Sequence, residues 1–84
     1  MFRGDDLTKV TIYSTPTCIF CNMAKEYFKE NNIDYEDFNV AENMIKAREM
    51  IEKSQQQGVP VIDIDGRIII GFDKAAIKEA LEIK

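Results

Sequence analysis

The chain has 84 residues and a net charge of −4, and it contains no histidine. Its length fits one domain spanning residues 1–84, and its composition, 45% hydrophobic and 31% charged, is that of a folded globular protein. The negative charge argues against nucleic acid or an anionic membrane as the main partner. The lack of histidine excludes Ser-His and Cys-His hydrolases and every histidine-ligated metal site.

The N-terminal sequence MFRGDDLTKV shows no apolar stretch and no cleavage site of a secretory signal. No segment is apolar over the length needed to span a bilayer. We therefore expect a cytoplasmic protein that acts as a monomer. Cytoplasmic thiols are kept reduced, so two cysteines close in sequence are expected to be catalytic or metal-binding rather than a structural disulfide.

Residues 8–14 alternate and are rich in β-branched side chains, which predicts a first strand. Pro16 ends this strand, and Thr17 is a suitable N-cap for a helix that ends near residues 30–32. The helix is predicted from an apolar stripe at helical spacing, which we expect to face the core. The stripe consists of Ile19, Phe20, Met23, Ala24, Tyr27 and Phe28.

The middle of the chain predicts a second strand over residues 33–40 and a second helix over residues 42–54. The inward positions of this helix are expected to be Met44, Ala47, Met50 and Ile51. We interpret the methionines of both helices as core residues rather than a metal site.

The last third predicts a β-hairpin followed by a helix. Residues 59–64 form a strand with a proline at its start, and Asp65-Gly66 is a strong two-residue hairpin signal before a strand over residues 67–70. Asp73 can cap a final helix that extends to Ile83. The resulting order, β-α-β-α-β-β-α, defines an α/β fold in which the first two strands are parallel through a right-handed crossover.

The two cysteines, Cys18 and Cys21, are separated by Ile19 and Phe20. Cys18 falls at the start of the first helix, where unpaired N–H groups and the helix dipole favour an anion such as a thiolate. Thiolate is the nucleophilic form, so Cys18 is predicted to attack disulfides. Cys21 lies about one turn further on the same face and is predicted to attack the resulting mixed disulfide.

Two other interpretations of this cysteine pair remain open. Free cysteines are often buried in cores, although Cys18 beside polar threonines is a poor core position. The pair could also be half of a zinc site completed by a second chain, but zinc usually takes four ligands and this chain offers two cysteines. We therefore expect no metal site in a single chain.

Three motifs occur in a fixed order, and together they resemble the glutaredoxin family. They are Thr17-Cys18-Ile19-Phe20-Cys21, Gly58-Val59-Pro60 before the hairpin, and Gly71-Phe72-Asp73 after it. The resemblance covers residues 9–83 and is closest to the glutaredoxin-like redoxins, including those that serve ribonucleotide reductase. It implies a thioredoxin-like fold with a central four-stranded mixed sheet.

The resemblance also implies that the Val59-Pro60 bond is cis and that the Val59 backbone pairs with an extended substrate or with glutathione. On this basis Thr15, Phe20, Val59, Pro60, Phe72 and Asp73 are the candidate substrate- or glutathione-binding residues. Glutathione-using relatives usually carry Pro-Tyr between the cysteines, a basic residue at position 15 and Gly-Gly at positions 71–72. The chain has other residues there, which weakens the expected glutathione site.

The sequence therefore predicts a thiol–disulfide oxidoreductase: a dithiol electron carrier that reduces protein disulfides through Cys18 and Cys21. The resemblance implies ribonucleotide reductase or a peroxidase as acceptor, and a thioredoxin-reductase-like flavoenzyme or glutathione as reductant. No tightly bound cofactor is expected, and glutathione is a candidate co-substrate. The alternatives are a glutathione-dependent glutaredoxin that reduces glutathione mixed disulfides, and a carrier of a [2Fe-2S] cluster.

Overall fold

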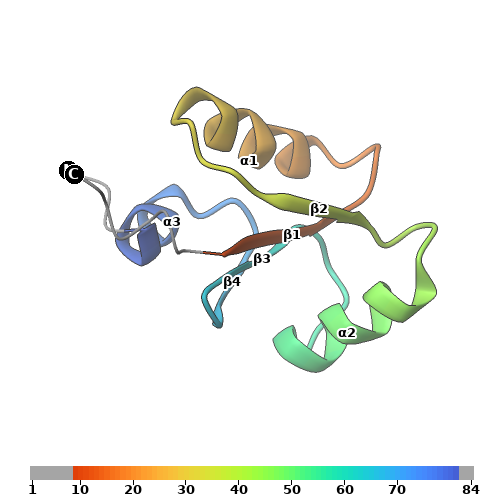
Figure 1. Ribbon diagram of the computed structural model, residues 1–84. Coiled ribbons are helices and arrows are strands. Elements are labelled where there is room, and N and C mark those ends of the chain that lie inside the picture. Colours follow the sequence, from red (N-terminus) through yellow and green to blue (C-terminus); the bar gives the residue numbers. More distant parts are fainter. Residues whose placement is uncertain (1–8, 82–84) are drawn as a thin grey trace.

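The computed structural model describes residues 9–81, which form a sheet with helices on both faces (Figure 1). In chain order the elements are β1 (Val10–Ser14), α1 (Ile19–Glu30), β2 (Glu36–Asn39), α2 (Met44–Ser54), β3 (Val61–Ile64), β4 (Arg67–Ile70) and α3 (Lys74–Leu81). The predicted order of elements is confirmed. The expected strand start at Thr8 and helix end at Ile83 lie outside the described residues. Within residues 9–81, every helix is too short or too polar to span a membrane.

The four strands lie in the order β2-β1-β3-β4. β1 and β2 are parallel, with Tyr13 opposite Phe38, as a right-handed crossover through α1 requires. β3 and β4 are antiparallel, as predicted, and are joined at Asp65 and Gly66, whose φ angles are 52° and 92°. These left-handed conformations are those of a tight hairpin turn, which explains the Asp-Gly pair. The mixed four-stranded sheet and three helices confirm the thioredoxin-like fold.

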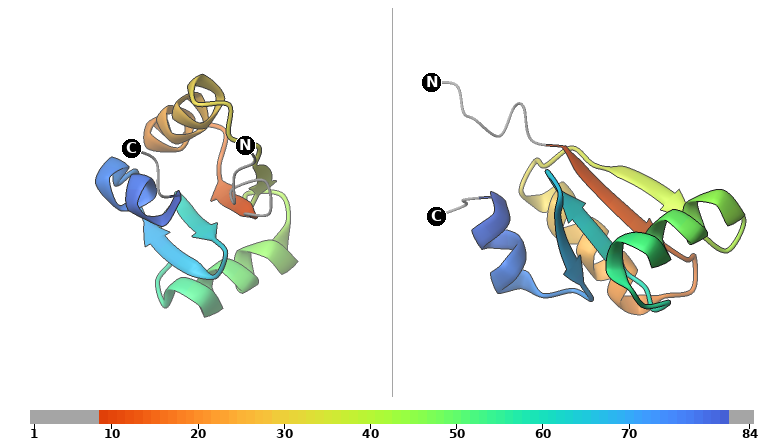
Figure 2. Two further views of the ribbon diagram at one scale, coloured as in Figure 1. Left: turned by 60° about the vertical axis from the view of Figure 1, so that its left-hand side comes forward. Right: turned by 90° about the horizontal axis from the view of Figure 1, so that it is seen from below.

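The sheet divides the apolar residues into two clusters because successive strand residues point to opposite faces. Figure 2 shows α1 and α3 on one side of the sheet and α2 on the other. The larger cluster lies under α1 and α3 and contains Val10, Ile12, Ala24, Tyr27, Phe28, Ile62, Ile64, Ile69, Ile77 and Leu81. The smaller cluster lies under α2 and contains Tyr13, Met50 and Val61.

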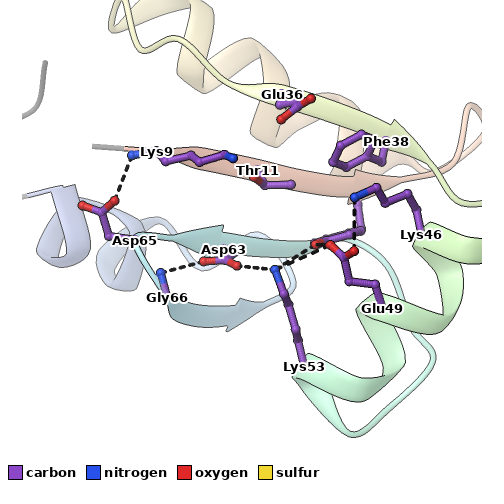
Figure 3. A pocket seen from close by; sticks show the side chains of 11 residues that line it. Lys9, Thr11, Glu36, Phe38, Lys46, Glu49, Lys53, Asp63, Asp65 and Gly66 are labelled. Carbon is purple, nitrogen blue, oxygen red and sulfur yellow. Dashed lines mark hydrogen bonds and ion pairs between the residues drawn. The ribbon is translucent and has the colours of Figure 1, made fainter. Parts of the chain in front are cut away.

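A polar network joins α2 to the sheet beside the smaller cluster (Figure 3). The buried Tyr13 hydroxyl donates a hydrogen bond to Glu49 and accepts one from Lys53 Nζ at 3.0 Å. Lys53 also pairs with Asp63 of β3 at 2.7 Å, and Lys46 pairs with Glu49 at 3.1 Å. The side chain of Tyr13 therefore packs inside the fold, and its hydroxyl anchors α2.

The predicted apolar faces of α1 and α2 are only partly correct. Ala24, Tyr27 and Phe28 of α1 are buried, whereas its N-terminal residues Ile19, Phe20 and Met23 are exposed. In α2 only Met50 of the predicted inward set is buried; Met44 is 81% exposed, Ala47 is half-buried and Ile51 is exposed. In both helices these exposed apolar side chains lie outside the buried face, which is formed by Cys21, Ala24, Tyr27 and Phe28 in α1 and by Met50 and Ser54 in α2, so they meet solvent instead of core.

Candidate redox site

Cys18 is the N-cap residue of α1, with extended backbone angles of φ −84° and ψ 115°. Its Sγ accepts a hydrogen bond from the Cys21 backbone N–H at 3.1 Å. The predicted N-cap, Thr17, was wrong: it lies one residue before the cap and is exposed. The sulfur takes the place that a Ser or Asp oxygen has in an ordinary cap. It accepts a hydrogen bond from an N–H group of the first helical turn that has no partner within the helix. This arrangement favours the anionic form of the group it contacts.

Cys21 lies one turn further along α1 and is completely buried, whereas Cys18 is partly exposed. Burial raises the pKa of the Cys21 thiol to about 12, and the hydrogen bond to Cys18 contributes in the same direction. The Thr15 main chain and the charge of Lys25 act to lower it. Of the two sulfurs, therefore, only Cys18 is reached by solvent, and a charge at Cys18 would further oppose the ionisation of Cys21.

The loop before β3 lies against Cys18. The Val59-Pro60 peptide bond is cis, as the resemblance implied, and Cys18 Sγ lies 3.9 Å from the Val59 carbonyl oxygen. Pro60 is buried, and its carbonyl accepts a hydrogen bond from the Gly71 N–H at 2.8 Å. The main chain of the second motif thus contacts Cys18 Sγ through Val59 and the third motif through Pro60.

The other candidate binding residues differ in their exposure and in the groups that they contact. The Thr15 carbonyl accepts a hydrogen bond from Cys18 N–H at 3.3 Å, and Phe20 is 59% exposed. The half-buried Phe72 ring stacks edge-on against Tyr27 at 6.0 Å between centroids. The Asp73 carboxylate accepts from the Ala76 N–H at 3.1 Å, so it caps α3, as the sequence predicted.

A groove of about 450 Å³ runs along α1 from the residue next to Cys18. Its lining consists of Ile19, Asn22, Met23, Glu26, Tyr27, Glu30, Phe72 and Lys74. The Tyr27 hydroxyl is buried without a hydrogen-bond partner among residues 9–81. The sequence analysis missed this groove because it assigned Ile19 and Met23 to the core.

Lys25 was not singled out in the sequence, although it lies four residues after Cys21 and so on the same helical face. Its Nζ donates to Asp37 Oδ2 at 2.9 Å, and Asp37 Oδ1 accepts from Ser14 Oγ at 2.6 Å. Over the part of the chain that the structure describes, there is no group of three or more His, Cys, Asp or Glu side chains arranged to hold a metal ion. Cys18 and Cys21 thus form a sulfur pair on one turn of α1, with Lys25 and Asp37 beside it.

Comparison with known proteins agrees with this arrangement. The glutaredoxin family model matches residues 10–69. A glutaredoxin-like 8.6 kDa protein of unknown function from the rubredoxin operon of Clostridium pasteurianum is 55% identical over 73 residues, which cover 87% of this chain and 97% of that protein. Glutaredoxin 3 of Escherichia coli is 33% identical, covering 80% of this chain and 81% of its own length. The crystal structure of a mutant of the thioredoxin-like protein BC3987 superposes with a TM-score of 0.85 at 29% identity, covering 90% and 97% of the two chains.

Proposed function

Because the chain belongs to the glutaredoxin family, we propose that it is a dithiol electron carrier that reduces protein disulfides. Cys18 is the attacking thiol and Cys21 the resolving thiol. One observation carries the proposal: a partly exposed sulfur caps α1 and lies 3.1 Å from the backbone N–H of a buried second cysteine. In this proposal the helix N–H group favours negative charge on the accessible sulfur, which lies next to a second sulfur that solvent does not reach.

The cycle has two exchange steps. The Cys18 thiolate attacks one sulfur of the substrate disulfide, forming a mixed disulfide and releasing the other substrate sulfur, which takes up a proton. Cys21 then loses its proton, attacks Cys18 Sγ and displaces the second substrate thiolate, which is protonated in turn. The substrate gains two electrons and two protons, and the protein is left with a Cys18–Cys21 disulfide that an external reductant must reduce.

The proposed reductant is a thioredoxin-reductase-like flavoenzyme. Position 15 supplies a main-chain carbonyl to Cys18 and has no basic side chain for a glutathione carboxylate. Phe72 fills space beside Tyr27 where two glycines would leave room for a tripeptide. In this proposal the carrier acts in the cytoplasm as a monomer, needs no bound cofactor, and transfers electrons to ribonucleotide reductase or a peroxidase.

A reductant assay tests the proposal directly. The oxidised protein is offered NADPH with thioredoxin reductase, or glutathione with glutathione reductase, and NADPH consumption is followed with insulin as the final disulfide. We expect turnover with thioredoxin reductase and little with glutathione. A Cys21→Ser variant should lose insulin reduction and accumulate a mixed disulfide detectable by mass spectrometry. Full insulin reduction by that variant would refute the dithiol cycle.

A glutathione-dependent reaction is the second candidate, and the Val59 main chain favours it. The Val59 carbonyl lies 3.9 Å from Cys18 Sγ, a position from which a main chain can pair with an extended peptide such as glutathione. Reduction of a glutathione mixed disulfide needs only the first cysteine, so Cys21→Ser would retain activity in that assay. The [2Fe-2S] alternative is tested by anaerobic reconstitution, which should leave the protein colourless.

A further inference from the structure

The resolving step of the proposed cycle requires the ionisation of a thiol that the fold buries. Cys21 is fully buried, and burial is the largest cause of its raised pKa. A thiol must lose its proton before it attacks a disulfide. Some feature of the protein must therefore offset the cost of forming an anion at this position. This inference rests on the proposed function, since an inert Cys21 would need no such feature.

The groups that influence Cys21 act differently in the two halves of the cycle. In the reduced protein, the hydrogen bond and charge of Cys18 oppose ionisation of Cys21. Once Cys18 is held in a mixed disulfide it carries no charge, so this opposition ends. The Thr15 main chain and Lys25 remain, and both favour the Cys21 thiolate. Lys25 supplies the only full positive charge among these influences.

The position of Lys25 is fixed by the sheet. It lies four residues after Cys21 on α1, a spacing that places the two side chains on one face. Its Nζ is 2.9 Å from Asp37 Oδ2, and its side chain is only 20% exposed. A charge in such a partly desolvated position is screened less than one at the surface.

Asp37 is itself held in place from the strand beneath it. The residue pairs with Ile12 in the parallel register, so it points to the sheet face that α1 covers. Ser14, which is 2% exposed, donates its hydroxyl proton to Asp37 Oδ1 at 2.6 Å. These two hydrogen bonds, from Ser14 and from Lys25 to Asp37, thus link β1 and β2 to the turn of α1 that follows Cys21.

We propose that Lys25 is a positioning residue that stabilises the Cys21 thiolate during the resolving step, held there by Asp37 and Ser14. Lys25 acts through its charge and takes no part in the proton transfer. The Cys21 proton passes to solvent, the bond between Cys21 and Cys18 sulfurs forms, and the bond between Cys18 and the substrate sulfur breaks. The departing substrate thiolate takes up a proton from solvent, so the step is balanced.

Two-phase kinetics with 5,5′-dithiobis(2-nitrobenzoate) test this role. The reduced protein should release one thionitrobenzoate when Cys18 attacks and a second when Cys21 resolves the mixed disulfide. The first phase depends on the reagent concentration, whereas the second is intramolecular and does not. Stopped-flow absorbance over a range of pH therefore reports the two cysteines separately in one experiment.

The key variant is Lys25→Gln, whose amide still donates to Asp37 but carries no charge. We expect its second phase to slow by roughly threefold to tenfold and its pH profile to move to higher pH, because an opposite charge nearby typically shifts a pKa by about one unit or more while the more basic thiolate is a better nucleophile. The first phase should change by less than about twofold. Lys25→Arg should restore the second phase.

Lys29→Gln is the matched control, since it removes the same charge from an exposed position one turn further along α1. It should leave both phases unchanged. An unchanged second phase in Lys25→Gln, or equal slowing in Lys29→Gln, would overturn the role of Lys25 while leaving the dithiol cycle intact. A second phase of the unsubstituted protein that scales with reagent concentration would instead refute the proposed function.

Discussion

The two cysteines differ in exposure although they lie one helical turn apart, and this difference predicts their reactivity. Burial raises the pKa of Cys21 to about 12, so its thiolate fraction near pH 8 is roughly a thousandfold below that of an ordinary thiol. Treating the native reduced protein with iodoacetamide at pH 8 should alkylate Cys18 and leave Cys21 unmodified. Peptide mass spectrometry locates the label, and urea provides the control in which both thiols react. Equal labelling in the native protein would contradict the prediction.

The same shift makes stability depend on pH in the alkaline range. Below about pH 9 the Cys21 thiol is protonated in both states, and its contribution to stability is complete. Between pH 9 and 12 the unfolded chain loses this proton while the folded chain keeps it, so the free energy of unfolding falls as the pH rises. Urea titrations under reductant at pH 8 and pH 10.5 should show this fall.

A Cys21→Ala variant isolates the contribution of this thiol, because burial also raises the pKa of Tyr13 and adds to the slope. In this variant the free energy of unfolding should fall less steeply with pH, by up to about 1.4 kcal/mol per pH unit. An identical slope in both proteins would show that Cys21 does not titrate in this range.

Single-residue features were only partly predictable from the sequence. The sequence placed Cys18 at the helix start but gave the cap to Thr17, because hydroxyl side chains are the usual caps and a sulfur is not. Lys25 was overlooked because its partner Asp37 lies on another element, and an ion pair between elements leaves no local pattern.

At the scale of elements, α2 is held to the sheet by a hydroxyl as well as by apolar contact. Tyr13→Phe removes a buried hydroxyl that donates to Glu49 and accepts from Lys53. We expect it to lower the free energy of unfolding by about 1–3 kcal/mol, because two charged side chains lose their shared partner. Urea denaturation of the reduced protein measures the change.

Tyr27→Phe is the matched control for Tyr13→Phe. It removes a hydroxyl that is buried without a partner among residues 9–81, so stability should be unchanged or higher. A loss as large as that of Tyr13→Phe would show that tyrosine hydroxyls stabilise this protein for some reason other than the network of α2.

The elements also show where hydrophobic periodicity fails. Ile19, Phe20 and Met23 recur at the same helical spacing as the buried residues of α1, and a helical period does not reveal how much of an apolar stripe is buried. The same holds for Met44 in α2. Strand β2 is shorter than the predicted residues 33–40, and its first two residues are exposed because it forms an edge of the sheet.

At the scale of the whole molecule, Phe28 is a large aromatic side chain in the interior of the larger cluster. Phe28 is fully buried and stacks near both Tyr27 and Tyr35, at 6.3 and 5.3 Å between centroids. Phe28→Ala should cost about 3–5 kcal/mol, a large share of the 5–15 kcal/mol typical of a domain. Thermal unfolding followed by circular dichroism measures the loss.

Met44→Ala serves as the comparison for Phe28→Ala, since Met44 is 81% exposed and should tolerate truncation within about 0.5 kcal/mol. If both variants unfolded at the same temperature, the division between core and surface described for this fold would be wrong.

The topology was predictable where connections are short or chiral. The crossover through α1 determined that β1 and β2 are parallel, and Asp65-Gly66 determined the hairpin of β3 and β4. The antiparallel pairing of β1 with β3, which brings Tyr13 opposite Val61, joins segments far apart in sequence. No local signal marks such a pairing, so the mixed sheet was expected only from the family resemblance, and its strand order and register came from the structure.

The separation of the two clusters by the sheet has a consequence for protein engineering. The network around Tyr13 and Lys53 lies on the α2 face, whereas Cys21 and Lys25 belong to α1 on the opposite face. Substitutions at sites that share no partner usually combine additively, within about 0.3–0.5 kcal/mol. Stability can therefore be raised by substitutions on the α2 side, independently of substitutions that change the reactivity of the thiols. The two sets can then be combined in one protein with their separate effects retained.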